Sequence, residues 1–181
     1  MPQVLLIRHA EKPTPDDAVQ GVDESGRPDA NELSVLGWQR AGALAALLSA
    51  DEPLQRLGLK RPRHLFAPCP TSEAPSARSV RTLQPLADVL QLPITLDFTL
   101  GDEAALARAA AALEDGVLIA WQHERLPRIA AALAGAMDGL PDAWPADRYD
   151  LIWAFDGTRD RWRFRQIPQL LLAGDEATPI G

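Results

Sequence analysis

The chain has 181 residues, of which 46% are hydrophobic and 24% charged, proportions typical of a globular domain. Its formal net charge of -7 and sequence pI near 4.9 provide no electrostatic footprint for nucleic acid or an anionic membrane. The single cysteine, Cys69, excludes an intramolecular disulfide framework, and no apolar run reaches the roughly 20 residues of a membrane helix. We therefore expect a soluble, cytoplasmic protein with one domain over residues 1–181 and neither nucleic-acid nor membrane partners.

Strand-like and helix-like segments alternate along the first half of the chain. Residues 4–7 form a continuous apolar run, which predicts a buried strand that ends at Arg8. Residues 13–31 are rich in Pro, Asp and Gly and have no period, which predicts a long loop. Ser34 is the predicted N-cap of the helix that follows. The further elements predicted here are a helix over 33–48, a strand over 64–67 and a helix over 76–90.

The second half continues this alternation and ends in a hairpin. Its predicted elements are a short strand over 94–96, a helix over 102–113, a strand over 117–121, a helix over 124–133, and two strands over 150–155 and 161–165. Residues 173–181 are expected to be a tail. Strands that alternate with helices predict an α/β fold, a three-layer α/β/α sandwich. We expect a mixed, mostly parallel central sheet, because the hairpin adds antiparallel strands.

Three polar clusters follow strands or open the next helix, namely residues 8–12, Arg78 with Thr82, and His123 with Glu124. In open α/β sheets ligands bind at the carboxyl ends of the strands, so these clusters are expected to converge there. Two arginines and two histidines suit a phosphate, because guanidinium groups bind its oxygens bidentately and a neutral imidazole is a nucleophile at pH 7. A protonated second histidine would add positive charge. No metal or cofactor is expected, because the arginines supply that charge.

Each member of this set also has a structural interpretation. His9 is compatible with a structural role at the start of a helix, and His123 with helix capping. Arg78 shares its predicted helix with Arg81, which is typical of a solvated basic face, and we expect Arg81 itself to be dispensable. The order in which the clusters occur along the chain favours the functional interpretation.

Four motifs of this sequence resemble those of the histidine phosphatase (phosphoglycerate mutase-like) superfamily. The run Leu6-Ile7-Arg8-His9-Ala10-Glu11 resembles the signature whose histidine becomes phosphorylated, with Ala10 in place of the more usual glycine. Residues 33–41, 78–87 and 117–123 are similar to the first-helix, second-arginine and second-histidine motifs. The resemblance covers residues 3–135. It implies a phosphate pocket formed by Arg8, His9, Arg78 and His123.

The remaining site residues follow from the same resemblance. Lys12, followed by a proline, is similar to a basic residue of the acid-phosphatase branch, which implies a phosphate contact; a solvated lysine at the pocket rim is the alternative. That branch places the general acid directly after the second histidine, at Glu124. Another branch implies an acid at Asp102, where it would contact the substrate, with Glu103 beside it. All three carboxylates also suit helix N-termini, where the macrodipole favours negative charge.

Together these features predict a phosphatase that hydrolyses a phosphomonoester or phosphohistidine through a phosphohistidine on His9. Its partner would be a phosphorylated small molecule or a phosphoprotein. The alternatives are a phosphoglycerate-type mutase, a non-catalytic module that binds phosphate or a partner, and a nucleotide-binding domain. Mutases that resemble this superfamily carry a long insertion before the second histidine, whereas only residues 102–122 separate Gly101 from His123. A nucleotide-binding domain is disfavoured because no glycine-rich loop follows the first strand.

Without such an insertion we expect an open site that accepts bulky phosphoesters or phosphohistidine. The loop over 13–31 is an alternative lid. Its Asp16, Asp17, Asp23 and Glu24 would then repel highly anionic ligands.

Overall fold

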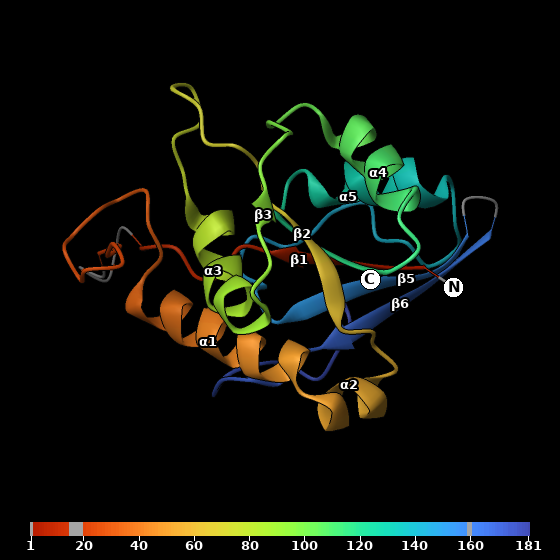
Figure 1. The fold of residues 1–181 in the computed structure, drawn as a ribbon, viewed down its shortest axis with the longest axis horizontal. Helices are drawn as coiled ribbons and strands as arrows, with labels where there is room; N and C mark the ends of the chain where they lie inside the picture. The colour runs from red at the N-terminus through yellow and green to blue at the C-terminus, as the bar shows by residue number, and fades with distance from the viewer. Residues whose placement is uncertain (1, 15–19, 159–160) are drawn as a thin grey trace.

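The computed structural model describes residues 2–14, 20–158 and 161–181, and Figure 1 shows their arrangement. Within these ranges one sheet has the strand order β3-β2-β4-β1-β5-β6. β3, β2, β4 and β1 are mutually parallel neighbours, whereas β5 is antiparallel to both β1 and β6. The strands are β1 (Gln3–Arg8), β2 (Pro62–Phe66), β3 (Ile94–Thr95), β4 (Gly116–Trp121), β5 (Leu151–Thr158) and β6 (Arg161–Pro168). The predicted mixed, mostly parallel sheet is therefore confirmed.

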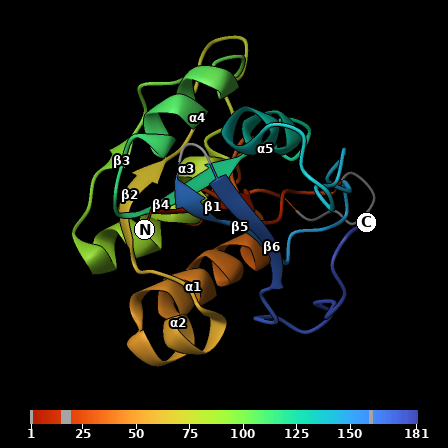
Figure 2. The ribbon, with the colours of Figure 1, turned by 90° about the vertical axis from the view of Figure 1, so that its right-hand side faces the viewer.

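Helices cover both faces of this sheet, as the turned view in Figure 2 shows. They are α1 (Val35–Ser49), α2 (Asp51–Leu57), α3 (Arg78–Leu90), α4 (Glu103–Ala111) and α5 (Leu126–Ala134). α1, α2 and α3 pack on one face, and α4 and α5 pack on the other. This is the three-layer α/β/α sandwich that the sequence predicts. In the described part of the chain no helix is long and apolar enough to cross a membrane.

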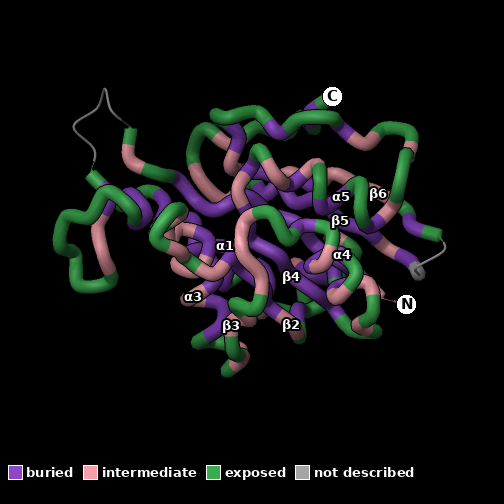
Figure 3. The backbone as a smooth tube through the Cα atoms, turned by 90° about the horizontal axis from the view of Figure 1, so that it is seen from above, coloured by how far each residue is buried: buried purple, intermediate pink, exposed green. Residues whose placement is uncertain are grey.

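Alternate side chains of β1 belong to the two different cores. Leu5 and Ile7 pack in the core with α1 and α3, whereas Val4 and Leu6 pack in the core with α4 and α5. Every residue of β1 and of its neighbour β4 is buried. Figure 3 shows β4 in purple at the centre of the molecule. Successive side chains of a strand point to opposite faces, so a strand covered by helices on both sides is apolar throughout. The apolar run over 4–7 therefore correctly predicts that β1 is a buried strand.

The sequence predicts where α1 begins, but it does not predict α2. The N-cap at Ser34 is confirmed, because its Oγ accepts a hydrogen bond from the N–H of Gly37 at 3.1 Å. α2 is not predicted. It has 7 residues, carries Pro53 near its start and buries only Leu54, so it is too short to show a helical period.

The C-terminal residues 173–181 pack against the rest of the chain, so the expectation of a tail is wrong. Asp175 forms an ion pair of 2.7 Å with Arg40 of α1, and both side chains are buried. Ile180 is buried, and its backbone exchanges hydrogen bonds of 2.6 and 3.1 Å with the side chain of Gln166. The segment shows no period in the sequence because side-chain hydrogen bonds, and no regular element of its own, hold it in place.

Candidate active site

The carboxyl ends of β1 and β4 bring the two histidines to one edge of the sheet. Arg8 and Trp121 are the last paired residues of these parallel strands, and the N–H of His9 donates to the carbonyl of Trp121 at 3.1 Å. His123 follows two residues later. The cluster of Arg78 and Thr82 reaches the same edge from α3, since Oγ1 of Thr82 accepts from the N–H of Ala10 at 2.8 Å. The three polar clusters therefore meet at one edge, as the sequence predicts.

The orientation of the His9 ring is fixed by a hydrogen bond from Nδ1. Nδ1 lies 2.7 Å from the carbonyl oxygen of Ala10, which requires Nδ1 to carry the proton and leaves the lone pair on Nε2. Burial lowers the pKa of His9 to about 3, and the nearby charges of Arg8, Arg78 and His123 add to this shift against the opposing Ala10 hydrogen bond. His9 is therefore a neutral imidazole at pH 7, which is the form that a nucleophile requires.

Arg8 is held rigidly beside this histidine. The residue is 1% exposed, and Nη1 donates to the carbonyls of Ala146 at 2.6 Å and Arg148 at 3.2 Å. Nη2 donates to the hydroxyl of Tyr149 at 3.0 Å, and the ring of Tyr149 lies 3.7 Å from the guanidinium carbon. Among the described residues Nε of Arg8 has no hydrogen-bond partner. A buried, preorganised cation with a donor to spare is suited to an anionic ligand.

Tyr149 is a residue of the site that no motif of the sequence indicates. Its ring centroid lies 6.2 Å from that of His9, and it reaches the site from the segment that precedes β5. Burial raises the pKa of Tyr149, against the opposing charge of Arg8, so its hydroxyl keeps its proton. It is the only tyrosine in the chain, but nothing in its local sequence distinguishes it.

Arg78 begins α3 and uses one side of its guanidinium to contact backbone. Nε donates to the carbonyl of Glu32 at 3.2 Å, and Nη2 donates to the carbonyl of Ala30 at 2.6 Å. Burial lowers the pKa of Arg78, and its charge in turn lowers the pKa of His9. The loop over residues 20–32 is therefore a neighbour of the site.

His123 and Glu124 form a pair on the turn between β4 and α5. Nδ1 of His123 lies 3.1 Å from Oε2 of Glu124, whose side chain is 65% exposed. Burial lowers the pKa of His123, as do Arg8 and Lys12, whereas Glu124 opposes the shift. The imidazole of His123 is thus neutral at pH 7, in contrast to the protonated form considered from the sequence. Lys12 is exposed, and its effect on His123 places its charge at the rim of the site.

Asp102 and Glu103 have structural contacts of their own. Oδ2 of Asp102 accepts from both the N–H and the hydroxyl of Thr99 at 2.8 Å, and these hydrogen bonds lower its pKa. Glu103 is buried, and its Oε1 accepts from Gly101 N–H at 3.1 Å and from Trp121 Nε1 at 3.2 Å. Both carboxylates therefore stabilise the loop before α4, which favours Glu124 among the three candidates for the general acid. No group of His, Cys, Asp or Glu in the described ranges is arranged to hold a metal ion.

The comparisons with known proteins agree with this geometry at the level of the fold. Neither a protein-family model nor a curated protein sequence matches the chain. Solved structures do match, and the fold of the chain is that of the histidine phosphatases. The resemblance seen in the motifs is confirmed for the fold.

Three of these structures show how far the likeness extends. The protein histidine phosphatase SixA, complexed with tungstate, matches with a TM-score of 0.58 and 19% identity over 92% of this chain and 97% of that one. A mycobacterial glucosyl-3-phosphoglycerate phosphatase matches with a TM-score of 0.54 and 14% identity, over 92% of this chain and 97% of that one. The ecdysone phosphate phosphatase of Bombix mori, in complex with tungstate, matches with a TM-score of 0.54 and 14% identity, over 100% of this chain and 98% of that one. The chain therefore spans nearly the whole of each fold.

Proposed function

We propose that this chain is a phosphatase that forms a phosphohistidine on His9. The observation that carries the proposal is the geometry of His9, a neutral imidazole whose Nδ1 is fixed by the Ala10 carbonyl, while Nε2 has no hydrogen-bond partner among the described residues. In the first step Nε2 attacks phosphorus, and the bond from phosphorus to the leaving oxygen breaks. In the second step water attacks phosphorus, the bond to Nε2 breaks, and inorganic phosphate leaves.

The cations around His9 supply most of the catalysis in this proposal. Arg8 is held by backbone carbonyls and Tyr149, so its charge needs no rearrangement when negative charge develops on the phosphoryl oxygens. Arg78 and Lys12 add positive charge from α3 and from the rim. His123 is neutral in the free site, and a bound phosphate dianion would raise the pKa of its imidazole.

Glu124 is the proposed general acid. A proton on its carboxyl group passes to the leaving alkoxide in the first step, and the carboxylate accepts a proton from water in the second. Its exposure leaves the carboxyl group accessible to a substrate, and the contact with Nδ1 of His123 keeps it at the site. Asp102 and Glu103 are less suited because their oxygens already accept hydrogen bonds within their own loop.

The geometry supports a hydrolase over a phosphoglycerate-type mutase. The chain between Gly101 and His123 consists of α4, β4 and their short connection, so it adds no wall over His9. A mutase must retain and reorient its intermediate, which an open site does not favour. The described residues of the loop over 13–31 lie beside α1 and α3 (Figure 1), whereas Asp16 and Asp17 lie outside the described residues.

We infer that the substrate is a phosphorylated small molecule or a phosphoprotein, with phosphohistidine and bulky phosphoesters preferred. The similarity to a protein histidine phosphatase supports the same substrate class. We also propose a cytoplasmic location, consistent with one free cysteine in the chain.

The decisive experiment traps the intermediate. Turnover of a phosphorus-labelled aryl phosphate is quenched in base, because phosphohistidine is labile in acid, and the labelled peptide is mapped. We expect label on His9 in the wild type and none in His9→Ala, which should lose activity. A label on a serine, or full turnover by His9→Ala, would contradict the proposal. A phosphopeptide and a phosphohistidine protein are then compared with sugar phosphates, and a hundredfold preference for one small metabolite would overturn the preference for phosphohistidine and bulky phosphoesters.

A further inference from the structure

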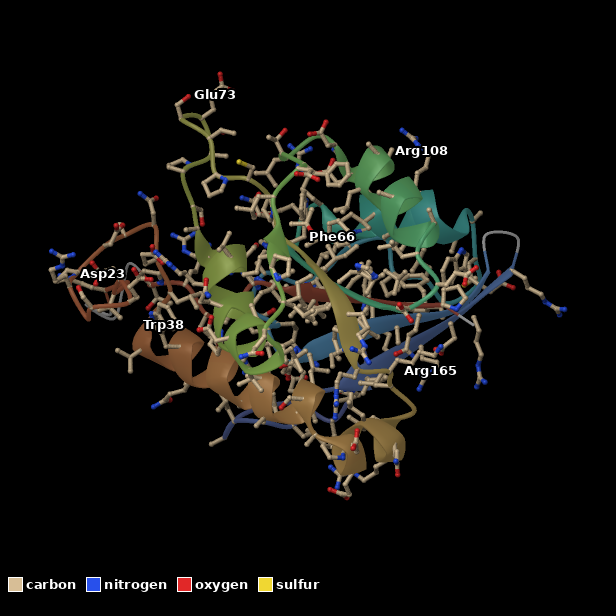
Figure 4. All side chains as sticks on the ribbon, viewed as in Figure 1. Asp23, Trp38, Phe66, Glu73, Arg108 and Arg165 are labelled. Carbon is tan, nitrogen blue, oxygen red and sulfur yellow. The ribbon has the colours of Figure 1, made fainter. Side chains whose placement is uncertain are left out.

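A short segment of the chain, residues 20–32, forms a strap beside the site. It is closed by backbone hydrogen bonds from Val22 N–H to the Leu33 carbonyl and from Asp29 N–H to the Gly21 carbonyl, each of 2.8 Å. The indole of Trp38 on α1 donates to the carbonyl of Val22 at 2.9 Å. Figure 4 shows Asp23 of the strap beyond Trp38 at the end of α1. The strap is therefore a folded unit anchored on α1.

Arg81 of α3 anchors the strap from the other side. Its Nε donates to both carboxylate oxygens of Glu32, at 3.1 and 3.0 Å, and Nη1 lies 2.8 Å from Oε2 of Glu24. The side chain of Glu32 is 8% exposed, so this pair is shielded from solvent on the Glu32 side. The hydrogen bond to Glu32 raises the pKa of Arg81. Arg81 is therefore not the free surface cation that the sequence suggests.

The residue that Arg81 holds also supports Arg78. The side chain of Glu32 binds Arg81, and its backbone carbonyl accepts from Nε of Arg78 at 3.2 Å. The carbonyl of Ala30, two residues earlier in the strap, accepts from Nη2 of Arg78 at 2.6 Å. Two strap carbonyls thus fix one side of the Arg78 guanidinium, and the charge of Arg78 acts on His9.

We propose that Arg81 is a positioning residue of the phosphate site, acting through Glu32 and the strap on the guanidinium of Arg78. This inference rests on the proposed function, because it requires Arg78 to contact the phosphoryl group. Without Arg81 the carboxylate of Glu32 loses its partner and the strap carbonyls lose their fixed position. A displacement of about 1 Å in a positioned group can cost on the order of a hundredfold in rate, so even a partial loss of order is measurable.

A double-mutant cycle on kcat/KM for an aryl phosphate tests this proposal. We expect Arg78→Ala to lower kcat/KM at least a hundredfold and Arg81→Ala to lower it about tenfold in the wild-type background. In the Arg78→Ala background, Arg81→Ala should change kcat/KM by less than about twofold, because residues that act through one another are not additive. Equal factors in the two backgrounds would overturn the proposal and leave Arg81 a merely structural role.

Two further variants separate positioning from loss of folding. Arg81→Lys keeps a charge near Glu32 and should recover part of the lost activity. Gly21→Ala removes no charge, but its Cβ would clash with the carbonyl oxygen of Asp29 and lie 2.8 Å from that of Glu32, so both of these strap carbonyls must move. It should therefore lower kcat/KM, and an unchanged kcat/KM in this variant would count against the proposal. The control is Arg56→Ala, which removes an exposed ion pair with Glu52 on α2 and should leave kcat/KM unchanged.

The outcome also distinguishes this inference from the proposed function. If the wild type turns over and labels His9, but the cycle is additive, the inference alone fails. If the wild type hydrolyses no phosphate ester, the proposed function fails, and the same cycle is measured on the Kd for inorganic phosphate. Non-additive losses in Kd would then support the positioning of Arg78 by the strap, and additive losses would overturn it.

Discussion

The ring of Tyr149 covers the guanidinium of Arg8, with 3.7 Å between the guanidinium carbon and the ring centroid. The hydroxyl of the same tyrosine accepts a hydrogen bond from Nη2 of Arg8 at 3.0 Å. One side chain thus holds the cation by its face and by its edge. Since Arg8 is the last residue of β1, this contact sets the orientation of a charge next to His9.

We expect variants of Tyr149 to lose activity in two steps. Tyr149→Phe keeps the ring and removes the hydrogen bond, which should cost about 1 kcal/mol of transition-state stabilisation, or roughly fivefold in kcat/KM. Tyr149→Ala also removes the ring contact and should cost at least a further tenfold. Steady-state kinetics with an aryl phosphate measures both. Wild-type kinetics in Tyr149→Ala would show that Arg8 needs no such support.

The general acid is identified by the dependence of rate on the leaving group. An aryl oxide hardly needs a proton to leave, so Glu124→Gln should keep much of its rate on an aryl phosphate. On an alkyl phosphate the same variant should lose at least a hundredfold, because the alkoxide must be protonated. The matched comparisons are Asp102→Asn and Glu103→Gln, whose carboxylates serve the loop before α4. If one of those two variants loses far more rate on the alkyl phosphate than on the aryl phosphate, and Glu124→Gln does not, the general acid lies in that loop.

The lowered pKa of His9 predicts a pH dependence of stability. An imidazole with an ordinary pKa of 6.5 in the unfolded chain and of about 3 in the folded protein binds a proton more readily when unfolded. Its contribution is therefore fully present above pH 6.5 and is lost as the pH falls toward 3, by up to about 1.4 kcal/mol per pH unit. The free energy of unfolding of His9→Gln should thus fall less than that of the wild type between pH 7 and 4.5, as denaturant titrations would show. Parallel pH profiles would mean that His9 is not desolvated.

The docked C-terminal segment predicts a large effect on stability when one of its contacts is removed. Asp175→Ala leaves the buried guanidinium of Arg40 with one fewer carboxylate partner, which should lower the free energy of unfolding by about 3 kcal/mol. The control is Glu52→Ala, which removes an exposed ion pair with Arg56. It should change the free energy of unfolding by less than about 0.5 kcal/mol. Urea titration of both variants measures the difference. Equal, small effects would show that residues 173–181 contribute little to stability.

The sequence alone predicts the order of the strands and of every helix except α2, and it carries the histidine motif. The apolar run before Arg8 and the one before His123 predict two buried strands, because strands covered on both faces must be apolar throughout. Parallel strands of one sheet end at the same edge, so the clusters that follow them are predicted to meet without any coordinate. These predictions depend on patterns within a few residues, so they do not require knowledge of how distant segments pack.

Only the tertiary structure decides the contacts that complete the site. Tyr149 and Arg8 are 141 residues apart, Arg81 and Glu32 are 49 apart, and Asp175 and Arg40 are 135 apart. Their pairing depends on how loops without a period pack against the sheet, so no local pattern encodes it. An arginine on a helix surface has the same sequence signal whether water or a buried glutamate faces it. The partner that folding brings to that arginine, and not its own sequence, decides what it does.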